Sequence, residues 1–460
     1  MFKRLLPIAS LTVLAGWCVI ASAQPPAKPN APPLTRDREE VADKDVPRSN
    51  DLMQVNRFAR ASEVDHVIKT DADRAVVDKV LKYNLFRLTW EEVQHDRGDR
   101  DSNNKDKTLI NIIMTDLIGS PPESQPRFLP SYFQGPPAEQ DMAAMRTRQL
   151  NNVIQMTPIF IKYCRVLLQN RNPIARVNAA RVLCRLAEWG QEAVVDEFIN
   201  IIQHPQESDA VRLWAFHGLE AIFLMQGSTD IKAKGLFQSK PGQARLVAAL
   251  EATYEWLQAN TKLPEQKIRY MKADEQAGLR YVRRAAVKAL GASHKALIVD
   301  DRAGNKQSGS IAQLIGNILS AEAGIVPAPD IRERFAAALA LCQIRGEAGS
   351  SYNADFAAFQ LGSFLTVLGT EINEFKKGEA AVNGLPYVAQ QLRTALDAFK
   401  SQRLTGPAAS YTKGMYDKAL PLLEYIDDFS KNTSAIKDLN DWLRENPPVN
   451  KEYIKPLGAK

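Results

Sequence analysis

The sequence predicts an all-α protein, an α-solenoid of stacked helical hairpins. From residue 151 onward, apolar residues recur at the three-to-four-residue spacing of a helix. Proline or glycine falls between these runs, and the alternating pattern of strands is nearly absent. The apolar helices come in pairs that recur at intervals of 36 residues or more, a period typical of solenoids. In such folds each pair buries its apolar face against the next pair.

The first 23 residues predict a cleavable export signal. Two basic residues precede an apolar run over residues 5–20, and an Ala-Ser-Ala cleavage site follows directly. The run is shorter than the roughly 20 residues that a permanent membrane span needs. We therefore expect cleavage before Gln24, and an exported protein that is periplasmic or extracellular. No other stretch is long and apolar enough, so we expect no transmembrane segment after cleavage.

A lipoprotein anchored through Cys18 is the alternative reading of the same segment. That processing requires a small residue before the cysteine, and Trp17 stands there. Cleavage removes two basic residues, which leaves 57 basic residues against 53 acidic ones and a net charge of +4. This balance is too mild to indicate a nucleic-acid partner.

Three cysteines remain after the predicted cleavage: Cys164, Cys184 and Cys342. An odd number in a chain of this length argues against a disulfide framework, because the core is large enough without one. Cys164 and Cys184 could pair across a helical hairpin. Each lies on an apolar face, however, so we expect small buried side chains rather than a bridge.

The region before the repeats is expected to be an irregular helical N-terminal cap. Residues 24–50 are rich in proline or charge and are expected to form a disordered linker. Within residues 51–150, the segment 72–88 predicts a helix and 109–118 an apolar helix or strand. The polar and proline-rich stretches between them predict long loops.

Four segments between residues 151 and 345 share one helical pattern. Each pairs a small or β-branched residue with arginine: Ala175-Arg176, Val211-Arg212, Val282-Arg283 and Ile331-Arg332. Four residues later stand Ala179, Ala215, Ala286 and Phe335, and eight residues later Leu183, Leu219, Leu290 and Leu339. These offsets lie on one helical face. Small residues on the same helices, Gly218, Ala289 and Ala338, allow a neighbouring helix to approach closely.

The shared pattern resembles the second helix of HEAT repeats, a family of stacked helical hairpins. An apolar helix precedes each of the four segments, over residues 154–168, 193–202, 246–257 and 311–319. The resemblance covers about residues 150 to 345 and implies HEAT-like stacking. The intervals of 36, 71 and 49 residues between the four segments are irregular, which places the excess length in inserted loops.

Residues 346–445 are expected to form a helical C-terminal subdomain, because apolar helical runs continue there without the repeated arginine. Residues 446–460 contain three prolines and no periodicity, and are expected to form a tail.

Catalytic and metal-binding motifs are missing from the sequence. The nucleophile elbow, the zinc-binding helix motif, haem attachment and both glycine-rich phosphate loops are all absent. The five histidines are scattered, so no catalytic residue, metal site or cofactor is predicted. Asp99, Asp101 and Asn103 could begin a calcium loop, but Asn104 and Ile110 replace the glycine and glutamate that such a loop requires.

A basic stripe is the strongest candidate binding surface. If Val282 and its equivalents face the core, Arg280, Arg284 and Lys288 point the opposite way. In HEAT-like solenoids the second helices line the concave surface, so the resemblance places this stripe inside the curve. Corresponding positions in the other helices carry Arg181, Leu213, Trp214, His217, Glu333 and Arg334. Such a surface suits an acidic protein segment or an anionic polymer, although any solvated helix face also collects basic residues.

Two further groups of basic residues have other expected roles. The four repeated arginines sit beside the buried face, and the family resemblance implies a ladder with acidic residues between repeats, with Asp209 as a partner of Arg212. The insertions over residues 227–243 and 292–309 carry Lys232, Lys234, Lys240, Lys295 and Lys306. They are either binding loops or tolerated length variation.

Together these patterns predict an exported, non-enzymatic scaffold that binds a protein or an anionic polymer of the cell envelope through its concave face. The sequence does not define its oligomeric state. One alternative is an exported hydrolase or lyase on a helical scaffold, with its acids and bases drawn from the N-terminal region. The other alternative is a structural component of the cell envelope.

Overall fold

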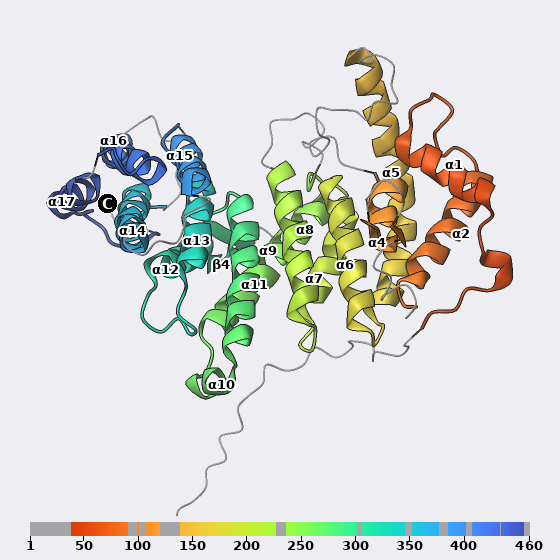
Figure 1. Cartoon of the computed structure of the whole chain (residues 1–460), viewed down its shortest axis with the longest axis horizontal. Coiled ribbons are helices and arrows are strands. Elements are labelled where there is room, and N and C mark those ends of the chain that lie inside the picture. Colours follow the sequence, from red (N-terminus) through yellow and green to blue (C-terminus); the bar gives the residue numbers. More distant parts are fainter. Residues whose placement is uncertain are drawn as a thin grey trace, which may run out of the picture. The chain divides into compact units, whose positions relative to one another are not determined.

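The computed structural model of the chain is all-helical apart from two short ribbons of antiparallel strands (Figure 1). It describes residues 38–90, 99–100, 106–119, 139–226, 236–300, 306–345, 352–376, 385–401, 407–432 and 434–454. The predicted export signal lies outside these residues, as do Asp101 and Asn103 of the calcium-loop pattern. Among the described helices, none is long and apolar enough to span a membrane.

The N-terminal region begins to pack earlier than the predicted linker allows. Residues 38–48 lie against α2 (Asp71–Arg87), where Lys82 forms a 2.6 Å ion pair with Asp45 and the Glu39 backbone N–H donates to Thr89. Helix α1 (Ser49–Arg60) and α2 follow, and α2 matches the helix predicted over 72–88. The apolar segment predicted over 109–118 is α4 (Leu109–Ile112), continued by a π-helical turn at Ile113–Leu117.

The predicted hairpins of the central region are present as pairs of helices. The first pair is α5 (Glu139–Leu168) and α6 (Pro173–Glu188), and the second is α7 (Val195–Gln203) and α8 (Asp209–Gln226). The third is α9 (Lys240–Thr261) and α11 (Ala273–Ala292), and the fourth is α12 (Ile311–Ser320) and α13 (Ile331–Gln343). Their starts follow ordinary capping chemistry: Asp330, for example, accepts a 2.7 Å bond from the Glu333 backbone N–H.

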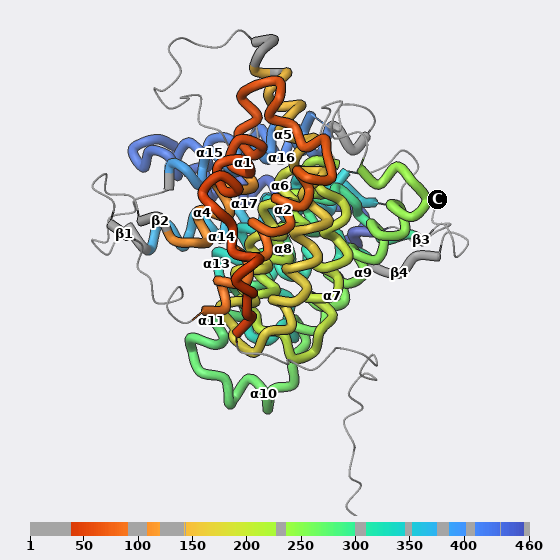
Figure 2. The backbone as a smooth tube through the Cα atoms, turned by 90° about the vertical axis from the view of Figure 1, so that its right-hand side faces the viewer, coloured from red at the N-terminus to blue at the C-terminus, as the bar shows by residue number. Residues whose placement is uncertain are grey.

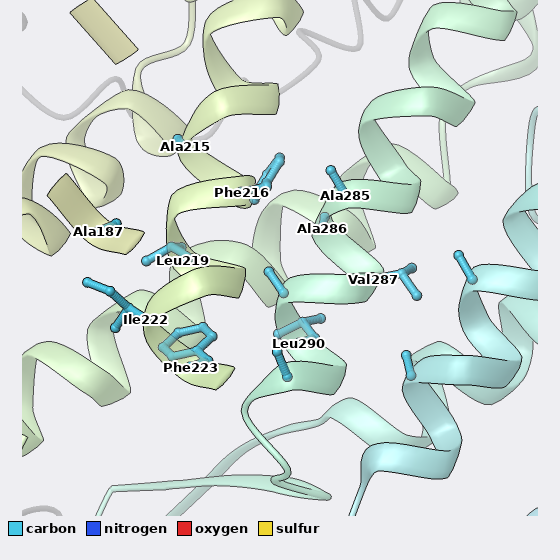
Figure 3. Packing of buried hydrophobic residues seen from close by; sticks show 14 of the residues in the cluster. Ala187, Ala215, Phe216, Leu219, Ile222, Phe223, Ala285, Ala286, Val287 and Leu290 are labelled. Carbon is cyan, nitrogen blue, oxygen red and sulfur yellow. The ribbon is translucent and has the colours of Figure 1, made fainter. Parts of the chain in front are cut away.

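The second helices of these pairs pack side by side in chain order. Helix α6 contacts α8, α8 contacts α11, and α11 contacts α13. Among the first helices α7 contacts α9, and α12 contacts α14 (Ala354–Lys376), which follows the fourth pair. Figure 3 shows the core around α8 and α11, where Phe216 of α8 points toward Ala285 and Ala286 of α11. Leu219, Ala286 and Leu290 are fully buried, as the shared helical pattern predicts, and so is Phe216.

The two predicted insertions contain ordered structure. Helix α9 begins at Lys240, inside the first insertion, whose residues 227–235 lie outside the described chain. The second insertion contains β3 (Leu297–Asp300) and β4 (Lys306–Ser310), an antiparallel ribbon with a bulge after Ile298. A smaller ribbon pairs β1 (Asp99–Arg100) with β2 (Asp106–Lys107). Helix α10 (Glu265–Tyr270) has no buried residue and projects from the α9–α11 hairpin (Figure 2).

The C-terminal helices continue directly from the central pairs. Helix α15 (Leu385–Ser401) contacts α13, and α16 (Pro407–Asp427) and α17 (Ala435–Glu445) pack on α14. The predicted tail is folded as far as residue 454. Tyr453 is 2% exposed and lies against the ring of Phe356, and its carbonyl accepts a 2.8 Å bond from the Asn353 backbone N–H.

The three cysteines are buried and form no disulfide, as predicted for Cys164 and Cys184. Burial strongly raises the thiol pKa of Cys164 and of Cys184. Both thiols are therefore protonated and inert packing groups.

Candidate functional site

A cavity of about 450 Å³ opens on the face of the second helices. Helices α8, α11 and α13 form its floor, and α14 and α15 flank it. Its apolar lining residues are Leu213, Ala285, Ile331, Phe335, Ala336, Leu339, Leu368, Ile372 and Val388. Its polar and aromatic lining residues are His217, Tyr281, Arg284, Lys288, Arg332, Glu371 and Gln391. The volume lies within the range of small-molecule sites, about 300–1,000 Å³.

The α11 side of the cavity carries the predicted basic stripe. Arg284 and Lys288 are one helical turn apart, and both line the cavity. The Arg284 guanidinium lies 4.8 Å from the centre of the Tyr281 ring, which holds the cation against an aromatic face. Arg280 continues the stripe along α11, where its Nε donates a 2.8 Å bond to the carbonyl of Ala328, and it does not line the cavity.

A chain of aromatic and cationic contacts extends the surface from the cavity to α6. His217 lines the cavity and lies edge-on to Trp214, with 5.8 Å between the ring centres. Arg181 of α6 lies 5.4 Å from the Trp214 ring. Partial burial lowers the pKa of Arg181, which still remains charged at neutral pH. Arg181, Trp214 and His217 were predicted from their helical positions, and the structure joins them to the cavity.

Arg334 and Glu333 lie away from this surface. Arg334 donates a 2.8 Å bond from Nε to the carbonyl of Leu319 and packs over the Phe364 ring, so it ties α13 to α12 and α14. Glu333 is fully buried in an ion pair with Arg283. Its predicted position on the basic surface is therefore wrong: the first turn of α13 faces the middle of α11, where Arg283 Nη2 donates a 2.7 Å bond to the Glu333 carboxylate.

Three of the four repeated arginines form the predicted ion pairs. Arg176 pairs with Glu207 at 3.1 Å, and Arg212 pairs with Asp209 at 3.3 Å. Arg283 pairs with Glu333 at 2.7 Å, as described above. The fourth, Arg332, differs because it is exposed and lines the cavity. Arg332 therefore does not form the ion pair that was predicted between repeats.

The cavity carries more positive than negative charge. Arg284, Lys288 and Arg332 line it together with a single carboxylate, that of Glu371. Within the described part of the chain, no carboxylate lies within ion-pair distance of these three cations. The lining contains one histidine and neither serine, threonine nor cysteine. This arrangement can hold an anionic group beside apolar surface.

Helices α14 and α15 supply the part of the cavity that the sequence pattern did not predict. Leu368, Glu371 and Ile372 come from α14, and Val388 and Gln391 from α15. These helices lack the repeated arginine pattern, so the sequence offered no register that placed them beside α13. Their spacing of three and four residues did indicate that each group shares one helical face.

One group of potential metal ligands lies in the described residues, far along the chain from the cavity. Glu63, Asp65 and His66 place ligand atoms within 4.8 Å of one another near the end of α1. His66 Nε2 lies 3.6 Å from Glu63, and both acids are exposed. Exposed acids beside a histidine form such clusters without a metal.

Comparison with protein-family models, with curated proteins and with solved structures gives no match for this chain. The resemblance to HEAT repeats therefore stays a prediction from the residues that carry it.

Proposed function

We propose that this chain is an exported, non-enzymatic binding protein with a HEAT-like solenoid, which engages an anionic macromolecule through the face formed by α6, α8, α11 and α13. The observation that carries this proposal is the cavity on that face, with three cations free of described acidic partners beside an apolar floor. The predicted export signal places the activity outside the cytoplasm.

The solenoid part of the proposal is supported by the order of the helix contacts. Helices α6, α8, α11 and α13 each contact the next in sequence, and α15 continues the row from α13. The repeated residues Ala215 and Ala286 are fully buried, and Ala286 lies on the side of α11 that faces α8 (Figure 3). Stacking of hairpins in sequence order is the arrangement expected when each pair buries its apolar face against its neighbour.

The choice of an anionic partner is supported by the charges that remain uncompensated on this face. The arginines that stabilise the fold have acidic partners at 2.7 to 3.3 Å. The cations that line the cavity have none among the described residues. Like charges held near one another by a rigid scaffold favour a ligand of opposite charge. Aromatic residues beside them, Trp214 and Tyr281, are of the type enriched at binding surfaces.

The test is an affinity capture with charge-reversed variants. The chain from Gln24 to Lys460 is used to capture partners from a cell-envelope extract, with washes at low and at moderate salt. We expect a specific protein or anionic polymer to be retained at low salt and released at moderate salt, because exposed charges are screened. The double variant Arg284→Glu/Lys288→Glu should lose this partner while the helical circular dichroism stays unchanged.

The matched control reverses two charges elsewhere. Lys267 and Arg269 lie on α10, which has no buried residue and does not line the cavity. The variant Lys267→Glu/Arg269→Glu has the same net charge as the test variant and should retain the partner. Equal retention by the wild type and by Arg284→Glu/Lys288→Glu would exclude this face, and equal loss in both variants would show attraction by net charge alone.

A further inference from the structure

We propose that the cavity is a binding site for a single-chain amphiphilic anion, an alkyl carboxylate, whose chain lies on the apolar floor and whose head group meets Arg284, Lys288 and Arg332. This inference concerns a small ligand, which the proposed function does not include, and its test uses no macromolecular partner. It follows from the way the cavity divides into an apolar part and a cationic part.

Apolar side chains make up more than half of the cavity lining. Nine of the lining residues are aliphatic, alanine or phenylalanine, and they come from all five helices that form the cavity. Five helices that converge on one cavity of about 450 Å³ enclose a ligand on several sides, which a flat patch does not do. A partner that offered only charge would leave this apolar surface in water. The ligand that fits must therefore bury hydrocarbon.

The cationic part selects the head group. Arg284 and Lys288 lie one turn apart on α11, and Arg332 begins the neighbouring α13, so the positive charges border the apolar floor on two adjacent helices. The lining contains one carboxylate, that of Glu371. Three cations against one carboxylate leave an excess of two positive charges, which a monovalent anion reduces without reversing. A cationic or zwitterionic head group would gain less from this balance.

Arg332, for which the repeat pattern predicts a structural ion pair, supports the same conclusion. In α6, α8 and α11 the repeated arginine is paired with an acid, whereas in α13 the equivalent Arg332 is exposed at the cavity. A guanidinium presents several N–H groups in a planar fork that matches a carboxylate. Arg332 is thus available for a ligand at the one place in the row where the cavity lies.

The test is isothermal titration calorimetry of the full chain with defined amphiphiles below their micellar concentrations. Hexanoate, octanoate and decanoate should bind with affinity that rises about fourfold per added methylene, the factor that corresponds to ~0.8 kcal/mol per buried CH₂. Acetate should not bind measurably. Decyltrimethylammonium, with the same chain and the opposite charge, should bind at least tenfold more weakly than decanoate.

Three variants separate the two parts of the site. Arg284→Gln/Lys288→Gln should weaken decanoate at least tenfold and abolish the preference over decyltrimethylammonium. Gln391→Trp places an indole in the cavity from α15 without changing charge, and should remove the gain from octanoate to decanoate. The control Lys267→Gln/Arg269→Gln on α10 should leave all affinities unchanged, because α10 does not line the cavity.

The contrary outcomes are distinct. Equal binding of acetate and decanoate would reduce the site to a cationic surface, and equal binding of decanoate and decyltrimethylammonium would reduce it to an apolar hollow; either result overturns the proposal. If no amphiphile binds but the macromolecule is still captured through Arg284 and Lys288, the cavity receives side chains of that partner. The amphiphile proposal then fails while the proposed function stands.

Discussion

The ion pair between Arg283 and Glu333 is the most deeply buried polar contact described between two helices of the row. Both side chains are 0% exposed, with Arg283 Nε 2.7 Å from Oε1 and Nη2 donating to Oε2 at 2.7 Å. Nη2 also donates to the carbonyl of Pro327 at 2.9 Å, and Nη1 to that of Asn260 at 3.3 Å. The pair therefore joins α11 and α13 to the end of α9 and to the segment before α13.

Burial determines how much this ion pair contributes to the stability of the fold. Removal from water raises the pKa of Glu333 above its ordinary value, although the Arg283 guanidinium acts in the opposite direction. The desolvation of the carboxylate thus outweighs its attraction to the arginine. A buried pair of this kind adds little net stability, yet it is costly to break from one side.

A double-mutant cycle tests this balance. Glu333→Leu leaves a buried guanidinium without its counter-charge and should lower the free energy of unfolding by about 3–5 kcal/mol. Arg283→Met/Glu333→Leu removes both charges and should cost clearly less, about 1–2 kcal/mol for the two carbonyls that lose a donor. Urea unfolding followed by circular dichroism measures these two variants and Arg283→Met alone, which completes the cycle. Additive losses in the double variant would show that the two side chains act independently.

The four repeated arginines show what residue patterns predict and where they stop. Their shared register predicted a position beside the buried face, and Arg176, Arg212 and Arg283 have the expected acidic partners. The acids of Arg176 and Arg283 lie 31 and 50 residues further along the chain, so no local pattern could name them. Arg332 has the same local sequence and faces the cavity instead, because its surroundings are set by α14 and α15.

At the scale of helices, glycine controls how closely α11 approaches α13. A Cβ atom added to Gly291 would lie 2.6 Å from the Cα of Ala340, which is a backbone atom and cannot rotate away. Gly278, on the same helix, has nothing within 4 Å of its added Cβ. The two glycines therefore lie on the same helix, but only Gly291 is packed against a neighbouring helix.

Alanine at these two positions should change stability in opposite directions. Gly291→Ala forces α11 and α13 apart and should cost about 1–3 kcal/mol by overpacking. Gly278→Ala meets open space and should stabilise by about 0.5–1 kcal/mol, because alanine loses less backbone entropy in a helix. Thermal unfolding of the two variants beside the wild type measures this. Stabilisation by both substitutions would mean that α11 and α13 can accommodate the added methyl group without loss of stability.

Helix positions were predicted well from the sequence because they depend on local rules. The four first helices were expected at the places now occupied by α5, α7, α9 and α12, where apolar spacing and breaking residues define each segment. The β3–β4 ribbon was missed. Its strand Leu297–Asp300 is short, with three consecutive apolar residues and no alternation, so the sequence predicts only an insertion there.

For the whole molecule, the cavity depends on helices that are distant in the chain. Its lining begins at Leu213 in α8 and ends at Gln391 in α15, and these positions meet only after α13 has packed on α11 and α15 on α13. The sequence predicted the basic half of this surface, since Arg284 and Lys288 share one helix. Of the apolar half it placed only Leu213 on this surface, because most of the other apolar lining residues come from α13, α14 and α15.

The proposed solenoid makes a prediction about how stability is distributed. In a row of hairpins that contact only their neighbours, a local defect should weaken adjacent pairs most and distant ones least. Phe216 is fully buried in α8, with its ring 4.9 Å from that of Trp256. Phe216→Ala should cost about 3–5 kcal/mol locally. Hydrogen exchange should then accelerate most in α8, next in α6 and α11, and least in α16.

Phe399→Ala is the matched control, because Phe399 is also fully buried and lies in α15. The same deletion there should move the centre of accelerated exchange to α15, α13 and α16, and leave α6 protected. A stack of neighbours produces two different maps, since each defect is felt through the helices that contact it. A single cooperative body opens as a whole, and would produce the same map for both variants. Identical maps would therefore exclude a quasi-one-dimensional solenoid even though the helices follow one another in order.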